Sequence, residues 1–281
     1  MKYMFQVIGI LALLIGSFVY SDKVSLASKS TDSLLNEIKS KSSNYVVKPS
    51  EPIINENTII PGTNGKEVDI NKSYRKMREI GYFDEQLLVY KTINLEYPLN
   101  KNLDKFIISG NEDKKEVALM FKIDNYDEIN DIVKALDSKK VKGTFFITST
   151  FLEKNNELVL SLLNEGHTVG NLSDNSDYTS ADFVWMKTVI TNAGLQNNNY
   201  CLAEDKNEEI LEICKLQSSR TIIPTKIITK YPLINVKSNL KSGAMFAFEV
   251  NEKLKEELLV IINYIESKGF TIDSLEDLLA E

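Results

Sequence analysis

Histidine and cysteine chemistry in this chain is limited to three side chains. His167 is the single histidine among 281 residues, and the two cysteines, Cys201 and Cys214, are not spaced as a CxxC pair. One imidazole cannot build a zinc or iron site that needs two, and two thiols cannot complete a four-thiolate site. A Ser/His/Asp triad would have to use His167. Other chemistry has to come from carboxylates, amines and hydroxyls.

The elements that must position such groups alternate regularly in the second half of the chain. Short apolar runs predict buried strands, and the stretches between them carry apolar residues at helical spacing. Repeated strand–helix units predict a parallel sheet, most simply a barrel, whose chemistry lies at the carboxyl ends of the strands. The predicted strands are 117–121, 143–147, 168–169, 200–202 and 244–248, and the predicted helices are 126–136, 152–163, 183–193, 208–216 and 254–267.

Four stretches in this half of the chain form an ordered set. They are VALMF at 117–121, VKGTFFI at 141–147, EGHTVGN at 165–171, and SGAMFAF at 242–248 with KGFTIDSL at 268–275. In order and separation they resemble the NodB-homology polysaccharide deacetylases, which act on peptidoglycan, chitin and related N-acetylated glycans. The resemblance covers about residues 116–279 and implies a distorted (β/α) barrel of about seven strands. The sequence before it predicts a small N-terminal α+β module and an N-terminal apolar segment.

The resemblance also implies a site, but its chemical residues differ in this chain. Family members hold a metal ion with one Asp and two His, use a second Asp as general base, and use a late His as general acid. The Asp-Asp pair corresponds to Lys122 and Ile123, and the two metal-binding His correspond to Leu172 and Ser176. The late His corresponds to Glu249. We therefore predict no catalytic residue of the family type, no bound metal and no cofactor.

The predicted pocket rim still carries charged and hydroxyl side chains. Lys122 and Glu249 end neighbouring strands, and an ion pair between them is the favoured interpretation. Two alternatives stay open: Asp124 and Glu249 as a carboxylate pair for acid–base work, and Asp124, Asp174 and Glu249 as oxygen ligands for Ca²⁺ or Mg²⁺. The rim comprises Lys122, Asp124, Ser173, Asp174, Ser176, Glu204 and Glu249.

The histidine, the tryptophan and the cysteines each have a structural and a functional interpretation. His167 matches a family histidine that precedes the metal ligands and is structural by motif position. Trp185 lies four residues before Val189, which favours packing of a helix against the barrel over stacking on a sugar ring. The cysteines are interpreted as buried thiols, with one disulfide as the alternative for an exported chain.

The N-terminal sequence predicts export. Residues 1–21 hold a nearly unbroken apolar run behind Lys2, which fits a signal peptide or a membrane anchor. Residues 22–58 predict a flexible stalk with a short helix near 32–40, residues 59–111 a small module, and residues 112–281 the barrel. The predicted location is extracytoplasmic, membrane-anchored or secreted, with the membrane contacted through the N-terminal segment.

The sequence thus predicts a deacetylase-like envelope protein without metal-dependent activity. Its expected role is glycan binding or scaffolding, with a peptidoglycan-like glycan as partner. The alternatives are hydrolysis of N-acetyl amide bonds at a non-standard site, and a protein–protein module that uses residues 59–111. A net charge of −7 and a pI near 5.1 argue against nucleic acid as a partner.

Overall fold

The computed structural model describes residues 32–123, 129–173, 178–195 and 199–281. It divides the chain into two units, which we name the N-terminal unit (up to Pro49, with Asn64–Asn94) and the barrel unit (Ser50–Thr63 with Leu95–Glu281). Within the described residues, no helix has the length and hydropathy needed to cross a membrane. The apolar segment predicted at 1–21 lies outside the described residues.

The N-terminal unit is a small α+β module. It comprises α2 (Ser33–Ser42), η1 (Ser43–Tyr45), β3 (Gly65–Val68), α3 (Ile70–Met77), η2 (Glu85–Leu87) and β4 (Tyr90–Ile93), with β3 and β4 antiparallel. Both helices begin at aspartates, Asp32 and Asp69, whose carboxylates accept backbone N–H groups of the first turn. A separate apolar cluster of Leu34, Ile38, Val68, Met77 and Leu88 packs these elements together.

The unit boundaries differ from those expected from composition. The predicted short helix forms as α2, but residues 33–49 fold into the N-terminal unit because α2 buries one apolar face. Residues 95–111, expected in the small module, belong to the barrel unit together with 50–63. The physical reason is strand pairing, since β2 (Thr58–Ile60) and β5 (Phe106–Ile107) extend the barrel sheet in parallel.

The barrel unit is built on one curled sheet, as predicted. Seven strands that lie next to one another in the order β10-β9-β8-β7-β6-β12-β11 are parallel throughout, and β5, β2 and β1 continue the sheet beyond β10. The remaining strand bounds are β1 (Ile53–Asn55), β6 (Glu116–Ile123), β7 (Thr144–Ile147), β8 (Thr168–Asn171), β9 (Tyr200–Leu202), β10 (Arg220–Ile222), β11 (Lys226–Ile228), β12 (Met245–Glu249) and β13 (Thr271–Asp273), the last of which also pairs with β6.

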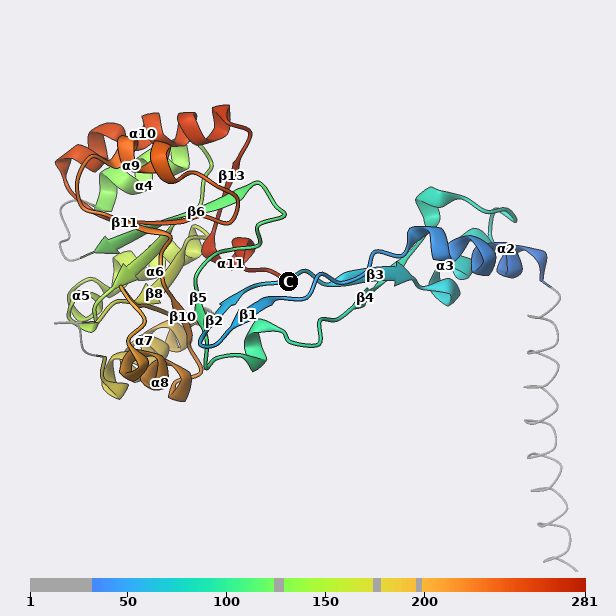
Figure 1. Cartoon of the computed structure of the whole chain (residues 1–281), viewed down its shortest axis with the longest axis horizontal. Coiled ribbons are helices and arrows are strands. Elements are labelled where there is room, and N and C mark those ends of the chain that lie inside the picture. The colour runs from blue at the N-terminus through green and yellow to red at the C-terminus, as the bar shows by residue number, and fades with distance from the viewer. Residues whose placement is uncertain (1–31, 124–128, 174–177, 196–198) are drawn as a thin grey trace, which may run out of the picture. The chain divides into compact units, whose positions relative to one another are not determined.

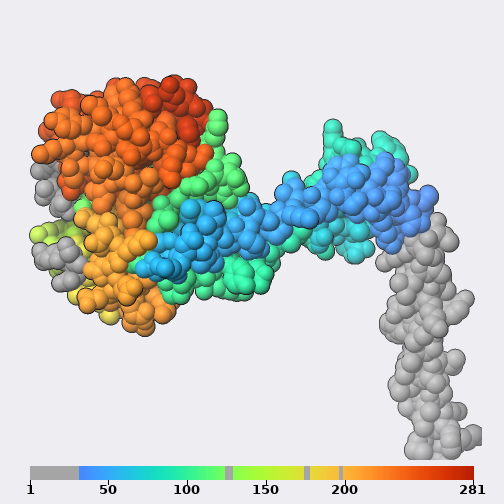
Figure 2. All heavy atoms as spheres, in the orientation of Figure 1, coloured from blue at the N-terminus to red at the C-terminus, as the bar shows by residue number. Residues whose placement is uncertain are grey.

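Helices cover the outer face of this sheet. Figure 1 shows α4, α9 and α10 together over the β6 and β11 side, and Figure 2 shows the surface that the side chains of α9 and α10 form there. The helices of the unit are η3 (Leu99–Lys101), α4 (Ile129–Ser138), α5 (Ser149–Lys154), α6 (Asn156–Asn164), α7 (Ser180–Asn192), α8 (Glu208–Leu216), α9 (Pro232–Asn239), α10 (Glu252–Ser267) and α11 (Leu275–Leu278).

Alternation along the strands separates two apolar cores. On β6, Val117, Leu119 and Phe121 join the cluster between sheet and helices, whereas Ala118 and Met120 join the cluster inside the barrel. Lys122 continues the inward series, so this charged side chain stands at the carboxyl end of the barrel interior. The strand order and alternation thereby define where a site can form.

The barrel interior below that end is filled by side chains. Phe146 is fully buried in the interior cluster, and a Cβ atom on Gly170 would come within 2.4 Å of its ring. Glycine at 170 is therefore required for the phenylalanine to lie across the barrel. At the opposite end, α11 adds Leu275 and Leu278 to the same cluster and closes the base of the barrel.

Candidate functional site

Lys122 is held by two carboxylates at the carboxyl ends of the strands. Its Nζ atom lies 2.5 Å from Oε1 of Glu204 and 3.7 Å from Oε1 of Glu249. Glu249 is the register partner of Lys122 across β12 and β6, which explains why the predicted pair forms. The lysine side chain is 13% exposed, whereas the glutamates are 62% and 46% exposed. A cation, balanced by two acidic groups, therefore occupies the centre of the barrel mouth.

The other family positions are occupied by buried aliphatic side chains. Leu172, where the family has its first metal-binding histidine, is 8% exposed and belongs to the interior cluster. Ile123, where the family has its metal-binding aspartate, is 1% exposed and belongs to the outer cluster. An ammonium and two hydrocarbon side chains supply no ligand atom to a cation. The described residues therefore do not fit the metal ion of the family.

The predicted rim is only partly described. Lys122, Glu204 and Glu249 come together as one ion-pair group, and Ser173 follows Leu172 at the end of β8. The remaining members Asp124, Asp174 and Ser176 lie outside the described residues. The sequence predicted that Glu204 lies on the rim but did not predict its contact with Lys122. That contact is shorter than the one between Lys122 and Glu249.

Tyr178 joins two strands beside the mouth and was missed from the sequence. Its hydroxyl lies 2.7 Å from the carbonyl oxygens of Asn171 and Leu202, and it accepts the backbone N–H of Leu202 at 3.0 Å. β8 and β9 share one register pair, Asn171 with Cys201, so this hydroxyl links strands that otherwise pair little. Burial raises the pKa of the Tyr178 hydroxyl far above its ordinary value.

A disulfide lies next to this tyrosine. Cys201 on β9 and Cys214 on α8 are bonded, and both sulfur-bearing residues are fully buried with Tyr178 and Phe183. The favoured interpretation of two free thiols is therefore replaced by its alternative. The reason is geometric: α8 packs back on the sheet so that its last turn faces the middle of β9. Disulfides persist in oxidising compartments, which agrees with an exported chain.

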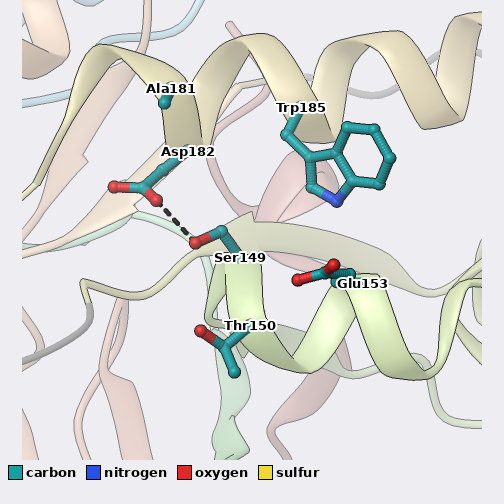
Figure 3. Close-up of a pocket in the computed structure, with 6 residues that line it drawn as sticks. All are labelled: Ser149, Thr150, Glu153, Ala181, Asp182 and Trp185. Atoms are coloured by element: carbon teal, nitrogen blue, oxygen red, sulfur yellow. Dashed lines mark hydrogen bonds between the residues drawn. The ribbon is translucent and has the colours of Figure 1, made fainter.

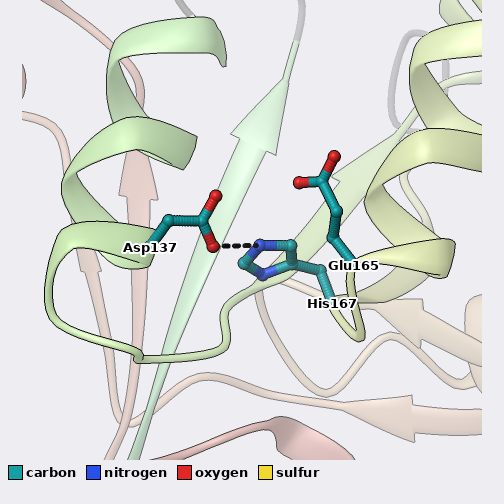
Figure 4. Close-up of side chains that lie close together, drawn as sticks. All are labelled: Asp137, Glu165 and His167. Atoms are coloured by element: carbon teal, nitrogen blue, oxygen red, sulfur yellow. Dashed lines mark ion pairs between the residues drawn. The ribbon is translucent and has the colours of Figure 1, made fainter.

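A second group of ionisable side chains lies at the opposite end of β7 and β8. His167, Asp137 and Glu165 bring one possible ligand atom each within 4.8 Å of one another (Figure 4). The His167 side chain is fully buried, its Nε2 atom lies 3.7 Å from Oδ1 of Asp137, and its Nδ1 atom accepts the backbone N–H of Gly143 at 3.1 Å. Burial, reinforced by the Lys142 charge, holds the pKa of His167 below its ordinary value.

The tautomer of His167 opposes metal binding at that group. A neutral imidazole carries one N–H, and the hydrogen bond from Gly143 uses the Nδ1 lone pair, so the proton lies on Nε2. Nε2 then carries the hydrogen and has no lone pair for a metal, and it lies 3.7 Å from Oδ1 of Asp137, beyond hydrogen-bond distance. His167 packs edge-on against Phe145 and fixes the starts of β7 and β8, which is the structural role predicted from its motif position.

Trp185 does not pack against the barrel as expected. Its side chain is 42% exposed, and it lines a pocket of about 310 Å³ between α5 and α7 (Figure 3). The inward face of α7 is formed instead by Phe183, Met186 and Ile190. Helical spacing alone did not distinguish these positions, because Trp185 adjoins the apolar stripe.

Comparisons with known proteins agree with this architecture. Residues 109–213 match the polysaccharide deacetylase family model. The YlxY protein of Bacillus subtilis strain 168 is 26% identical over 275 residues, covering 90% of this chain and 85% of that protein.

Solved structures show the same fold. BA3943, described as a CE4 family pseudoenzyme from Bacillus anthracis, has 22% identity and a TM-score of 0.65, covering 89% of this chain and 96% of its own. A mutant of BA3943 with restored enzymatic activity gives a TM-score of 0.66. The Bc1960 peptidoglycan N-acetylglucosamine deacetylase has 19% identity and a TM-score of 0.53, covering 61% of this chain and 91% of its own.

The matches differ in extent. The Bc1960 match covers 61% of the chain, which is less than the barrel unit makes up, whereas the BA3943 match covers 89%, which is more than the barrel unit alone contains. The barrel unit contains residues 109–213, which match the polysaccharide deacetylase family model, and it shares its fold with the solved CE4 structures. Lys122, Ile123 and Leu172 occupy the positions where the family that the sequence resembles has its base and metal ligands.

Proposed function

We propose that this protein is an exported, non-catalytic member of the deacetylase-like proteins that binds a peptidoglycan-type glycan in the cell envelope. The observation that carries the loss of catalysis is the Lys122 ammonium held between Glu204 and Glu249. A metal ion bound beside this lysine would meet its positive charge at close range. Two unit charges about 4 Å apart near a protein surface repel by roughly 4 kcal/mol, and a divalent ion doubles that.

The glutamates do not provide a substitute site for a cation. Glu204 and Glu249 are already paired with Lys122, so binding a metal between them would first require displacement of the ammonium. The aliphatic Ile123 and Leu172 offer no further ligands. A barrel of this kind keeps the shape of a deacetylase, and its described residues at the family positions do not include the groups that would polarise water or an acetyl carbonyl.

Two observations support an envelope location. The Cys201–Cys214 disulfide is expected to form and persist outside the reducing cytosol. Within residues 1–21, the apolar run from Met4 to Tyr20 follows Lys2 as it does in an export signal or an anchor. We propose that the chain is anchored through this run or released after its cleavage.

The ligand class is supported by the fold. The peptidoglycan deacetylase Bc1960 shares the barrel, so a glycan chain of that type is the ligand to test first. A barrel that has lost hydrolysis can retain surfaces that contact the polysaccharide, because binding and bond cleavage depend on different side chains.

The test uses the purified full chain in mild detergent. Acetate release from N-acetylated peptidoglycan is measured with added Zn²⁺ or Co²⁺, and Bc1960 serves as the positive control. We expect no acetate release, no tightly bound transition metal by elemental analysis, and co-sedimentation of the protein with insoluble peptidoglycan. Acetate release that a chelator abolishes would show that the barrel is an active metal-dependent amide hydrolase.

Other results separate the remaining roles. Acetate release that persists in chelator would indicate a non-standard hydrolytic site on the rim. Absence of both acetate release and sedimentation would favour a protein–protein module. Retention of the protein on peptidoglycan without turnover supports the proposal.

A further inference from the structure

The pocket beside Trp185 lies at the same end of the barrel as the ion-pair group. α5 begins two residues after β7 ends, and α7 begins shortly after β8, so both helices start at the carboxyl ends of neighbouring strands. Their first turns face one another across a pocket of about 310 Å³, near the lower size limit of small-ligand sites. Figure 3 shows Trp185 and Asp182 on the α7 side and Thr150 and Glu153 on the α5 side.

The lining combines an aromatic face with carboxylates and hydroxyls. It consists of Ser149, Thr150, Glu153, Ala181, Asp182 and Trp185. A partly exposed indole offers a flat apolar face on which a pyranose ring can stack, while the polar groups suit its hydroxyls. The lining contains no cationic side chain, so it does not favour an anionic ligand.

The two carboxylates of the pocket differ in their hydrogen-bond partners. Asp182 accepts the Ser149 hydroxyl at 2.6 Å and the Thr179 backbone N–H at 2.7 Å, which fixes it as part of the α7 cap. Glu153 is exposed, and within the described part of the chain it has no hydrogen-bond or ion-pair partner. An uncompensated carboxylate opposite an indole face attracts a cation.

We propose that this pocket binds a sugar ring bearing a free ammonium, such as a de-N-acetylated glucosamine unit of a glycan. Glu153 pairs with the ammonium, Trp185 stacks on the ring or lies over the charge, and the hydroxyl side chains contact the ring oxygens. An N-acetylated ring is neutral and leaves Glu153 without a partner. This inference rests on the proposed glycan-binding function. It names the site at which the glycan binds and the de-N-acetylated form as the preferred ligand.

The single tryptophan provides a direct measurement. Because Trp185 is the one Trp of the chain, tryptophan fluorescence, excited at a wavelength where the twelve tyrosines absorb little, reports on this pocket. The probes are the glucosamine tetrasaccharide and its fully N-acetylated counterpart, titrated at a pH where the sugar amine is protonated. We expect the glucosamine form to change the fluorescence and to bind at least about tenfold more tightly than the acetylated form.

Variants identify the groups responsible, with calorimetry as the readout where the tryptophan is removed. Glu153→Gln keeps the size of the side chain and is expected to weaken binding of the glucosamine tetrasaccharide about tenfold, with little change for the acetylated form. Trp185→Ala is expected to weaken both. Val184→Ala, at an exposed neighbouring position on α7, is the matched control and is expected to change neither.

Three outcomes would overturn the inference. Equal binding of both tetrasaccharides with no effect of Glu153→Gln would show that the pocket does not recognise the ammonium. Equal competition by a trilysine peptide would show that the pocket recognises an ammonium group without requiring a sugar ring. If the fluorescence does not change but the protein still sediments with peptidoglycan, this pocket is not the binding site and the proposed function stands. If the protein neither changes its fluorescence nor sediments with peptidoglycan, the proposed function is contradicted as well.

Discussion

The single histidine illustrates how one residue can set a pH dependence. His167 is neutral in the fold because burial and Lys142 lower its pKa, while the carboxylates Asp137 and Glu165 act in the opposite direction. The unfolded chain binds a proton near pH 6.5, whereas the folded chain binds it at lower pH. Stability is therefore fully present above pH 6.5 and is lost as pH falls from there toward the folded pKa.

The expected slope is at most about 1.4 kcal/mol per pH unit, because one group is involved. It is measured as the free energy of unfolding in urea at several pH values between 5 and 8. His167→Asn keeps an acceptor for the Gly143 N–H and cannot titrate, so its stability, although lower overall, should lack this component. Identical pH profiles for the two proteins would contradict the assignment, since the chain has no second histidine.

Lys122 is expected to contribute little to stability despite two ion-pair partners. Glu204 and Glu249 are largely solvated, so screening limits each contact, and the lysine has lost part of its hydration. We expect Lys122→Met to lower the free energy of unfolding by about 1 kcal/mol and to leave peptidoglycan sedimentation unchanged.

The matched control is Lys241→Met, which removes a solvated ion pair with Glu112 away from the mouth. Its effect should be nearer to zero, because Lys241 is 56% exposed. A loss above about 3 kcal/mol for Lys122→Met would instead indicate that the two glutamates are costly without their cation. Such a result would mean that the fold at the carboxyl ends of the strands depends on the charge of Lys122.

At the scale of elements, Tyr178 connects β8 to β9. Tyr178→Phe keeps the ring against Phe183 but removes the hydroxyl that accepts the Leu202 N–H and donates to a carbonyl oxygen. A buried polar group left without a partner costs about 1–3 kcal/mol. We expect a loss of that size in urea unfolding, together with faster hydrogen exchange of the Leu202 amide.

Tyr231→Phe provides the comparison, because that tyrosine is 66% exposed and its hydroxyl can bond to water. It should leave stability within about 0.5 kcal/mol of the unchanged protein. An equally small effect of Tyr178→Phe would mean that water takes over the role of the buried hydroxyl.

The elements also show what sequence reasoning can and cannot predict. Apolar runs and strand ends predicted the parallel strands and the meeting of Lys122 with Glu249, because both depend on order along the sheet. The contact of Tyr178 with Leu202 spans 24 positions and leaves no periodic pattern. The exposure of Trp185 depends on the exact rotation of α7, and the disulfide depends on how α8 packs against β9, neither of which spacing determines.

At the scale of the whole molecule, the chain passes between its two units more than once. Residues 50–63 leave the N-terminal unit and add β1 and β2 to the barrel sheet, and the chain rejoins the barrel unit at Leu95. The exit and return lie near one another, because Thr63 pairs with Ser50, and the Glu96 N–H bonds to the Glu51 carboxylate at 3.2 Å. The N-terminal unit is therefore an insertion as well as an N-terminal extension.

This path predicts which truncation leaves a stable barrel. A chain that starts at Ser50 and replaces residues 64–94 with a short Gly/Ser linker keeps every strand of the barrel sheet, so it should fold cooperatively and retain the disulfide. A chain that starts at Leu95 lacks β2 and the fully buried Ile59, and it leaves Ile107 on β5 uncovered. Each buried isoleucine contributes about 1.5–3 kcal/mol, so this chain should be less stable by about 3 kcal/mol or more. Urea unfolding of both proteins measures the difference, and equal stability would show that the barrel does not depend on the strands that precede the insertion.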